Sequence, residues 1–128
     1  MLSMNFTIDA DIDRSLIIEK IYGTWTVETA REYHREFMEV AGPLTKGKWA
    51  KIINLTNWKS SYPEMISIIG HHLKWCRENG MVLSINIIQN PVTIGQLKKM
   101  FVIGGTMEMS RLVRSQEEAE KILREEGF

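Results

Sequence analysis

A chain of 128 residues is near the commonest size of a single domain, so we expect one domain over residues 1–128. Its 16 lysine and arginine residues balance its 16 aspartate and glutamate residues, so the basic excess typical of nucleic-acid-binding proteins is absent. The only cysteine, Cys76, excludes an internal disulfide and is typical of a protein in a reducing compartment.

The first two predicted elements form a β-hairpin. Residues 4–8 alternate in polarity and place Phe6 and Ile8 on one face, as in a half-buried strand. Residues 15–23 read as a second strand after a short acidic turn. Because the turn is short, we expect the two strands to be antiparallel.

A first helix is predicted between residues 26 and 41. Thr26 is a suitable N-cap, and Glu28 lies in the first turn, where the positive end of the helix dipole favours a carboxylate. The residues that recur at helical spacing are Val27, Ala30, His34, Phe37 and Ala41. Gly42 followed by Pro43 signals the end of this helix.

Three further strand–helix pairs complete the chain. Strands are predicted at residues 48–55, 81–89 and 108–114. Helices are predicted at residues 64–78, at residues 93–103 and from residue 115 onward. Asn79-Gly80 and Gly104-Gly105 end the first two of these helices, because glycine readily adopts the left-handed conformation that follows a helix.

Each of these three helices begins with a capping box, in which Ser or Thr is followed three residues later by Glu or Gln. The predicted N-caps are Ser61, Thr93 and Ser115, and their partners are Glu64, Gln96 and Glu118. Pro63 favours the same helix start, because the first turn has no use for its missing N–H donor. We expect the Ser61 cap to stabilise the protein by about 0.5–2 kcal/mol.

The predicted element order is ββαβαβαβα. Repeated strand–helix–strand units indicate parallel strands joined by right-handed crossovers. The sequence therefore predicts an α/β fold with a five-stranded mixed sheet, formed by an N-terminal hairpin and then parallel strands, and four helices.

Ser60 and Ser61 lie at the junction between the third strand and the helix that follows. In an α/β sheet, the loops that leave the carboxyl ends of strands form a border where ligands and partners bind. A phosphate there would add about −1.5 to −2 charges beside a helix N-terminus. Ser60 is the freer of the two to be modified, whereas the favoured interpretation of Ser61 is a helix cap without a regulatory role.

The element order, the length and the strand–serine–helix junction resemble the SpoIIAA-like superfamily, which includes STAS domains, bacterial anti-sigma-factor antagonists and short stand-alone proteins. The resemblance covers residues 4–126. Residues 51–59, KIINLTNWK, and the capped helix after them are most similar to the stand-alone proteins. The resemblance to the superfamily implies a non-enzymatic regulatory domain that binds another protein.

In the antagonists, a phosphorylatable serine opens the helix after the third strand, within an Asp-Ser/Thr-Ser-Gly pattern. The corresponding segment here is residues 57–62, NWKSSY, so Ser60 or Ser61 matches the phosphorylated serine by position. The aspartate and the glycine of the pattern are missing, so the resemblance carries regulation by phosphorylation over to this chain only weakly.

Three aspartates near the N-terminus resemble a calcium-binding loop but do not complete it. Asp9, Asp11 and Asp13 alternate as in a calcium loop, but the glycine and glutamate that such a loop needs are replaced by Arg14 and Lys20. We therefore expect a solvated acidic turn.

His72 and Cys76 are four residues apart on one helix face, whereas a zinc site needs at least three protein ligands. His34 is remote in sequence, although the fold can bring it close. We expect no metal site, and Cys76 is predicted to be a small buried core residue.

The sequence contains no known catalytic or cofactor-binding motif, so we predict no catalytic residue, no cofactor and no enzyme. Residues 81–97 form the longest run without charge, but polar residues interrupt it, so no membrane insertion is expected. The N-terminus lacks the basic start and apolar stretch of a signal peptide. These features predict a cytoplasmic protein.

The binding surface is predicted at the carboxyl ends of the strands. Its residues are Trp25, Asn57, Trp58, Tyr62 and Asn90, together with Ser60 and Ser61. The favoured alternative is that both tryptophans pack back against their own helices. Two functions remain open: a regulatory domain that binds an unknown protein partner or a second copy of itself, and a carrier or sensor of a small apolar, lipid-like molecule.

Overall fold

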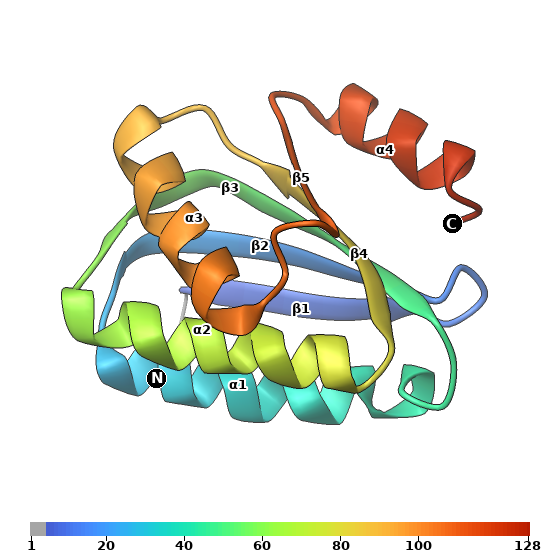
Figure 1. The fold of residues 1–128 in the computed structure, drawn as a ribbon, viewed down its shortest axis with the longest axis horizontal. Coiled ribbons are helices and arrows are strands. Elements are labelled where there is room, and N and C mark those ends of the chain that lie inside the picture. The colour runs from blue at the N-terminus through green and yellow to red at the C-terminus, as the bar shows by residue number, and fades with distance from the viewer. Residues whose placement is uncertain (1–4) are drawn as a thin grey trace.

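Five strands form one mixed sheet in the computed structural model, which describes residues 5–128 (Figure 1). They are β1 (Phe6–Asp11), β2 (Leu16–Trp25), β3 (Trp49–Ser61), β4 (Met81–Ile87) and β5 (Ser110–Val113). The strands follow one another across the sheet in chain order. β1 and β2 are antiparallel and the other pairs are parallel, which confirms the predicted fold class and element order. Met4, in the first predicted strand, lies outside the described residues.

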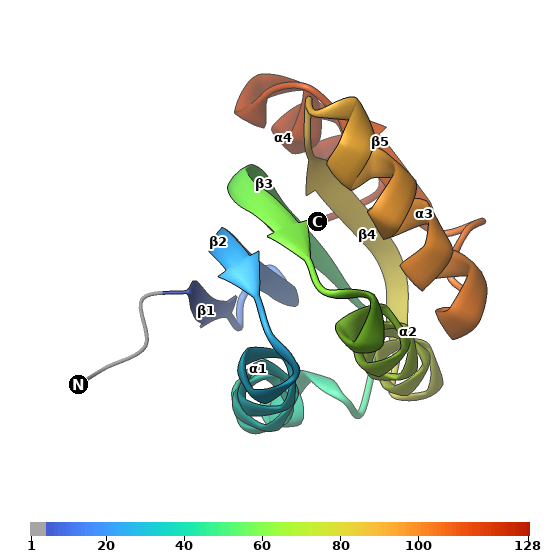
Figure 2. The ribbon, with the colours of Figure 1, turned by 90° about the vertical axis from the view of Figure 1, so that its left-hand side faces the viewer.

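Four α-helices and one short 3-10 helix connect and cover the strands. They are α1 (Val27–Ala41), η1 (Gly42–Leu44), α2 (Pro63–Glu78), α3 (Pro91–Gly104) and α4 (Gln116–Glu125). Figure 2 shows α1 and α2 on one side of the sheet and α4 on the other, with α3 beside α2 near β4. In the described part of the chain, no helix is long and apolar enough to cross a membrane.

The two faces of the sheet contribute to two hydrophobic cores. Along β3, Ile53 points into the larger core under α1, α2 and α3, and Ile52 points into the smaller core under α4. Neighbouring strand residues alternate in this way because successive side chains leave a strand on opposite faces. The larger core contains most of the aromatic residues, including Phe37 and Trp49, and it also surrounds the functional groups described below.

β3 is longer than predicted and ends at Ser61 instead of residue 55. On one side, β2 continues beside it as far as the pair Trp25 and Ser61. On the other side, the side chain of Gln96 takes the place of a strand. Its Oε1 accepts a hydrogen bond from the Ser61 N–H at 3.0 Å, and its Nε2 donates to the Ser61 carbonyl at 3.1 Å.

The predicted N-cap role of Ser61 is therefore wrong. α2 begins at Pro63, and its N-cap is Tyr62, whose side chain makes no capping hydrogen bond. The physical reason is that strand pairing and Gln96 together hold Ser61 in the sheet. The Ser61 hydroxyl instead accepts a hydrogen bond from Trp58 Nε1 at 3.1 Å.

Thr93 is also not an N-cap. Pro91 starts α3 two residues earlier, and the Asn90 side chain caps it by accepting from the Val92 N–H at 2.9 Å. Thr93 is buried, and its hydroxyl donates to the Asn90 carbonyl. The other two predicted caps are confirmed, because Thr26 accepts from the Thr29 N–H and Ser115 accepts from the Glu118 N–H.

We expect Gln96→Ala to lower the free energy of unfolding by about 1–2 kcal/mol, because it leaves the partly buried N–H and carbonyl of Ser61 without partners. Ser61→Ala should cost less than about 1 kcal/mol, since Trp58 Nε1 keeps a bond to the Ser60 carbonyl. Urea unfolding followed by tryptophan fluorescence measures both. The control is Gln89→Ala, an exposed glutamine near the same border. A larger loss for Ser61→Ala than for Gln96→Ala would contradict this account.

Candidate functional site

The residues predicted to form a binding rim lie on one border of the sheet. β2, β3 and β4 are parallel, so their carboxyl ends point the same way. Trp25 is opposite Ser61 across the β2–β3 ladder, and Asn90 follows the end of β4. Asn57, Trp58 and Asn90 line one surface groove together with Lys59. The geometry thus brings the predicted residues together, although their role remains a prediction.

The residues of the predicted rim differ from one another in exposure. Tyr62 is 56% exposed, and Asn57 and Asn90 are also exposed, whereas the Trp25 and Trp58 side chains are buried. Ser60 is half-buried and Ser61 is buried. Of the two serines, Ser60 is therefore the more accessible to a modifying enzyme.

Both indoles are buried, as in the favoured interpretation that they pack back against the helices, and neither faces outward along the rim. Trp25 packs at 5.8 Å from the ring of Phe6 and at 5.0 Å from the ring of Tyr33, and its N–H donates to the Tyr22 carbonyl. The Trp58 N–H is taken by Ser60 and Ser61. Both rings turn inward because the core offers them apolar contacts while nearby oxygens accept their N–H groups.

The sequence did not predict an apolar groove on the outer surface of α2 and α3. It is lined by Pro63, Ile66, Ser67, Lys98, Lys99, Val102 and Ile103. Val102 is 67% exposed and Ile103 is 44% exposed, and the two lysines are the only charged residues in the lining. The available signal was that α3 carries more apolar residues than one buried stripe of Ile94, Leu97 and Phe101 requires.

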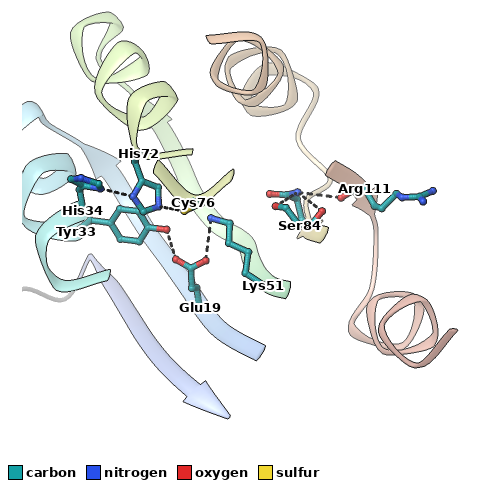
Figure 3. Close-up of polar contacts among 9 residues, drawn as sticks. Glu19, Tyr33, His34, Lys51, His72, Cys76, Ser84 and Arg111 are labelled. Carbon is teal, nitrogen blue, oxygen red and sulfur yellow. Dashed lines mark hydrogen bonds and ion pairs between the residues drawn. The ribbon is translucent and has the colours of Figure 1, made fainter. Parts of the chain in front are cut away.

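A buried polar cluster lies between the sheet and the helices (Figure 3). Glu19 of β2 and Lys51 of β3 form an ion pair at 3.3 Å, and their side chains are 0% and 3% exposed. The Tyr33 hydroxyl of α1 donates a hydrogen bond to the same carboxylate. Burial raises the pKa of Glu19, and the charge of Lys51 lowers it in part. Burial also raises the pKa of Tyr33 well above its ordinary value, so the hydroxyl keeps its proton.

A chain of two histidines and a thiol adjoins this cluster (Figure 3). The Nδ1 atoms of His34 and His72 lie 2.7 Å apart, and His72 Nε2 lies 3.6 Å from Cys76 Sγ. Burial, with a smaller effect of Lys51, lowers the pKa of His72 well below its ordinary value. Burial raises the pKa of Cys76 to about 12, so the thiol is protonated and a poor nucleophile.

A cavity lies above the polar cluster, between β3 and β4 and the helices α2 and α3. Its volume that water molecules can occupy is about 40 Å³. Its polar lining residues are Tyr33, Lys51, Ser61, His72 and Asn86. Its apolar lining includes Trp25, Trp58, Met65, Ile69, Leu97, Met100 and Phe101. The inward-facing tryptophans of the predicted rim are therefore walls of an internal space.

The sequence did not predict this buried cluster, because a charged residue within a strand is usually exposed to solvent. A signal was present: period-two alternation places Glu19 between the buried Ile17 and Ile21, and Lys51 between the buried Trp49 and Ile53. His34 does approach His72, as the fold allowed. Across residues 5–128, no group of three or more His, Cys, Asp or Glu side chains is arranged to hold a metal ion.

No protein-family model matches the chain, and no curated protein matches its sequence. Two solved structures share its architecture. The Bacillus cell fate determinant SpoIIAA, solved in the phosphorylated form, has a TM-score of 0.61 and 14% identity, over 93% of this chain and 99% of SpoIIAA. The protein TM1081, solved by NMR, has a TM-score of 0.63 and 12% identity, over 97% of this chain and 90% of TM1081.

These comparisons confirm the predicted SpoIIAA-like fold. The match extends over nearly the whole length of both chains in each case. At 12% and 14% identity, the likeness is one of fold. Function must then be inferred from the residues of this chain, because one fold hosts many functions.

Proposed function

We propose that this chain is a non-enzymatic, cytoplasmic regulatory domain that binds a protein partner through one surface, which we call the docking face. The docking face consists of Tyr62 and the groove residues Pro63, Ile66, Ser67, Lys98, Lys99, Val102 and Ile103. The observation that carries the proposal is that the apolar groove residues, of which Val102 and Ile103 are exposed, lie beside two lysines and next to the exposed Tyr62. Surfaces of this kind mark sites of protein association.

The chemistry of the docking face favours a partner with an apolar ridge bordered by carboxylates. Lys98 and Lys99 flank the groove, Lys59 lies on the neighbouring rim, and the groove lining contains no carboxylate. Opposite charges at the edge of an interface orient the partner and speed association. The common fold with SpoIIAA supports a regulatory role, since that protein is a cell fate determinant.

Phosphorylation of Ser60 would regulate this docking. Ser60 is half-buried, follows Lys59 directly and lies two residues before the exposed Tyr62. A phosphate there would place about −1.5 to −2 charges beside the lysine-flanked surface, and it would compete with a carboxylate of the partner. SpoIIAA has been solved in a phosphorylated form, which supports this part of the proposal.

Photo-crosslinking tests the docking face. With p-benzoylphenylalanine in place of Tyr62, we expect one predominant covalent adduct with a different protein in the cells of origin, detected by mass spectrometry. The matched control places the same group at Ile12, which is 54% exposed in the turn between β1 and β2, on the opposite border. Val102→Glu, which puts a carboxylate in the groove, should reduce the adduct at least tenfold, and Ser60→Glu should also reduce it.

Equal adducts at positions 12 and 62 would contradict the docking face. An adduct with a second copy of the chain would replace the proposed partner by a homodimer. Because Val102 and Ser60 are not core residues, both variants should keep their free energy of unfolding within about 0.5 kcal/mol of the unmodified protein. This check separates a lost contact from a lost fold.

A further inference from the structure

The internal cavity has the properties of a binding site for a small molecule, separate from the docking face. Small-molecule sites are typically concave and mostly apolar, with a few polar groups that orient the ligand. Here the walls are aromatic and aliphatic side chains from β2, β3, α2 and α3, and the polar residues lie among them. From this arrangement we infer that the cavity binds a short-chain carboxylate, with its head group on Lys51 and its apolar tail against Trp58 and Phe101.

Lys51 is the residue that selects the head group. Its side chain is 3% exposed and lines the cavity. An ammonium group has three N–H donors, and within the described chain its only charged partner is Glu19, at 3.3 Å. The face of the Phe37 ring, 5.3 Å from Nζ, is its other neighbour. Glu19 does not use all three donors of the ammonium group, and a buried cation is stable only when its donors are satisfied. The remaining donors are therefore available to an oxygen ligand.

Most of the other polar side chains of the cavity are already committed. The Tyr33 hydroxyl donates to Glu19, whereas the Ser61 hydroxyl accepts from Trp58 and keeps its own O–H to donate. Both ring nitrogens of His72 are occupied by His34 and Cys76.

The amide group of Asn86 donates to Ser84 and to the Arg111 carbonyl, which leaves its side-chain oxygen as an acceptor. Among the described lining residues, Lys51 is the one with a charged side chain, and it has spare donors, which favours an anionic oxygen group.

The size of the cavity limits the length of the tail. The cavity volume of about 40 Å³ suffices for a few water molecules or for a head group with its first carbons. Met65 and Met100 line the same space, and unbranched methionine side chains can change rotamer at low cost. The inference therefore requires these two side chains to move when a chain of about six carbons enters, and water is the competing occupant of the space.

Binding of a carboxylate should take up a proton. Glu19 and the incoming carboxylate would both lie beside Lys51, and two carboxylates close together do not both ionise readily. Burial already raises the pKa of Glu19, so this residue is the expected proton acceptor. His72 and His34 face the cluster from α2 and α1, and burial lowers the pKa of each, so they contribute less to this uptake near neutral pH.

Titration with hexanoate, and with hexan-1-ol as the matched neutral probe, tests the inference. Trp25 and Trp58 line the cavity, so their fluorescence should change on saturation. We expect one hexanoate per chain, bound at least tenfold more tightly than hexan-1-ol. Calorimetry in two buffers of different ionisation enthalpy should report the uptake of up to one proton.

Variants locate the head group. Lys51→Met alone leaves a buried carboxylate unpaired, so the test uses Glu19→Gln together with Lys51→Met, which removes both charges. Hexanoate should then bind no better than hexan-1-ol. Lys20→Met is the matched control, because Lys20 is exposed on the opposite face of β2 and its loss should leave binding unchanged.

Three results would overturn the inference: equal affinity for the two probes, unchanged hexanoate binding in the double variant, and no binding of either probe. The last result would identify the cavity as a water-filled space that solvates Lys51. The inference does not depend on the proposed docking function. The crosslink tests Tyr62 and the titration tests Lys51, so either result can fail while the other holds.

Discussion

Lys51→Met is expected to lower the free energy of unfolding by about 3–5 kcal/mol, the usual effect of removing one partner from a buried ion pair. Lys51 and Glu19 are 2% and 1% exposed, and no other cation lies beside the Glu19 carboxylate in the described part of the chain. Methionine is unbranched and only one atom shorter than lysine, so most of the loss reports the removed ammonium group, including its place over the Phe37 ring. Urea unfolding at pH 7 measures it.

The double variant separates charge from packing. Glu19→Gln with Lys51→Met removes the uncompensated carboxylate but keeps an oxygen that can accept from the Tyr33 hydroxyl. We expect it to recover most of the stability lost in Lys51→Met. If Lys51→Met costs less than about 1 kcal/mol, or if the double variant is no more stable than the single one, then the buried pair is not as described.

The free energy of unfolding that Lys51→Met loses relative to the unmodified protein should become smaller as the pH falls. Burial raises the pKa of Glu19 in the folded state above its unfolded value, and loss of Lys51 removes an interaction that lowers it. A group whose pKa is higher in the folded state than in the unfolded state binds more protons when folded. Its contribution to the free energy of unfolding is therefore fully present below the unfolded pKa and is lost as the pH rises through the folded pKa. In the variant, folded Glu19 is protonated at a higher pH, and protonation removes the unpaired charge.

His72 also makes the difference in free energy of unfolding between the variant and the unmodified protein smaller at low pH. Its folded pKa is lowered, so both proteins lose stability as the pH falls below the unfolded value of 6.5. Lys51 contributes to that lowering, so its removal reduces the loss in the variant. The difference between the variant and the unmodified protein, measured between pH 5 and pH 8 as a function of urea, should therefore be smallest at the acidic end.

The element order could be predicted because it depends on local alternation and on stop signals. Asn79-Gly80 and Gly104-Gly105 end helices where expected, with Gly80 and Gly105 in left-handed conformations at φ values of 106° and 69°. Such signals are read within a few residues of each other. The fold class followed from them, because strand–helix–strand repeats allow few topologies.

The start of α2 could not be read locally. The capping-box pattern from Ser61 to Glu64 satisfies the sequence rule, yet the partner that fixes Ser61 is Gln96, 35 residues later. The sequence pattern instead pairs the same glutamine with Thr93, at the start of its own helix. A polar side chain has one best partner, and here a long-range contact displaced the local one, which also lengthened β3.

The candidate site shows a similar limit. The rim residues lie on one border of the sheet because the strands that carry them are parallel, and binding at this border stays a prediction. The sequence left open which of them face outward, because burial of Trp25 and Trp58 depends on space left by α1, α2 and α3. The Glu19–Lys51 pair joins two strands that are adjacent only in the folded sheet.

α3 links the docking face to the cavity. Leu97, Met100 and Phe101 on one side of the helix are cavity walls, whereas Lys98, Lys99 and Val102 on the other side belong to the docking face. The position of α3 against α2 therefore sets both sites. That position depends on two glycines, Gly70 of α2 and Gly104 of α3, which allow the two helices to pack closely.

Gly104→Ala should accordingly lower the free energy of unfolding by about 2–3 kcal/mol, in the upper range for overpacked cores. A Cβ at Gly104 would lie 2.7 Å from the Gly70 carbonyl oxygen and 2.7 Å from Leu73 Cβ, closer than Cβ atoms in folded proteins approach other atoms. Neither neighbour is the far end of a flexible side chain, so α3 must move away from α2. Urea unfolding measures the loss.

The matched control lies on the same helix. A Cβ at Gly95 meets nothing within 4 Å, so Gly95→Ala should stabilise the protein by up to about 1 kcal/mol through helix propensity alone. Displacement of α3 in Gly104→Ala should also weaken the crosslink at Tyr62, because Val102 and Ile103 move with the helix. Equal stability of the two variants would mean that the α2–α3 contact yields without cost, and the coupling of docking face and cavity through α3 would then have no structural basis.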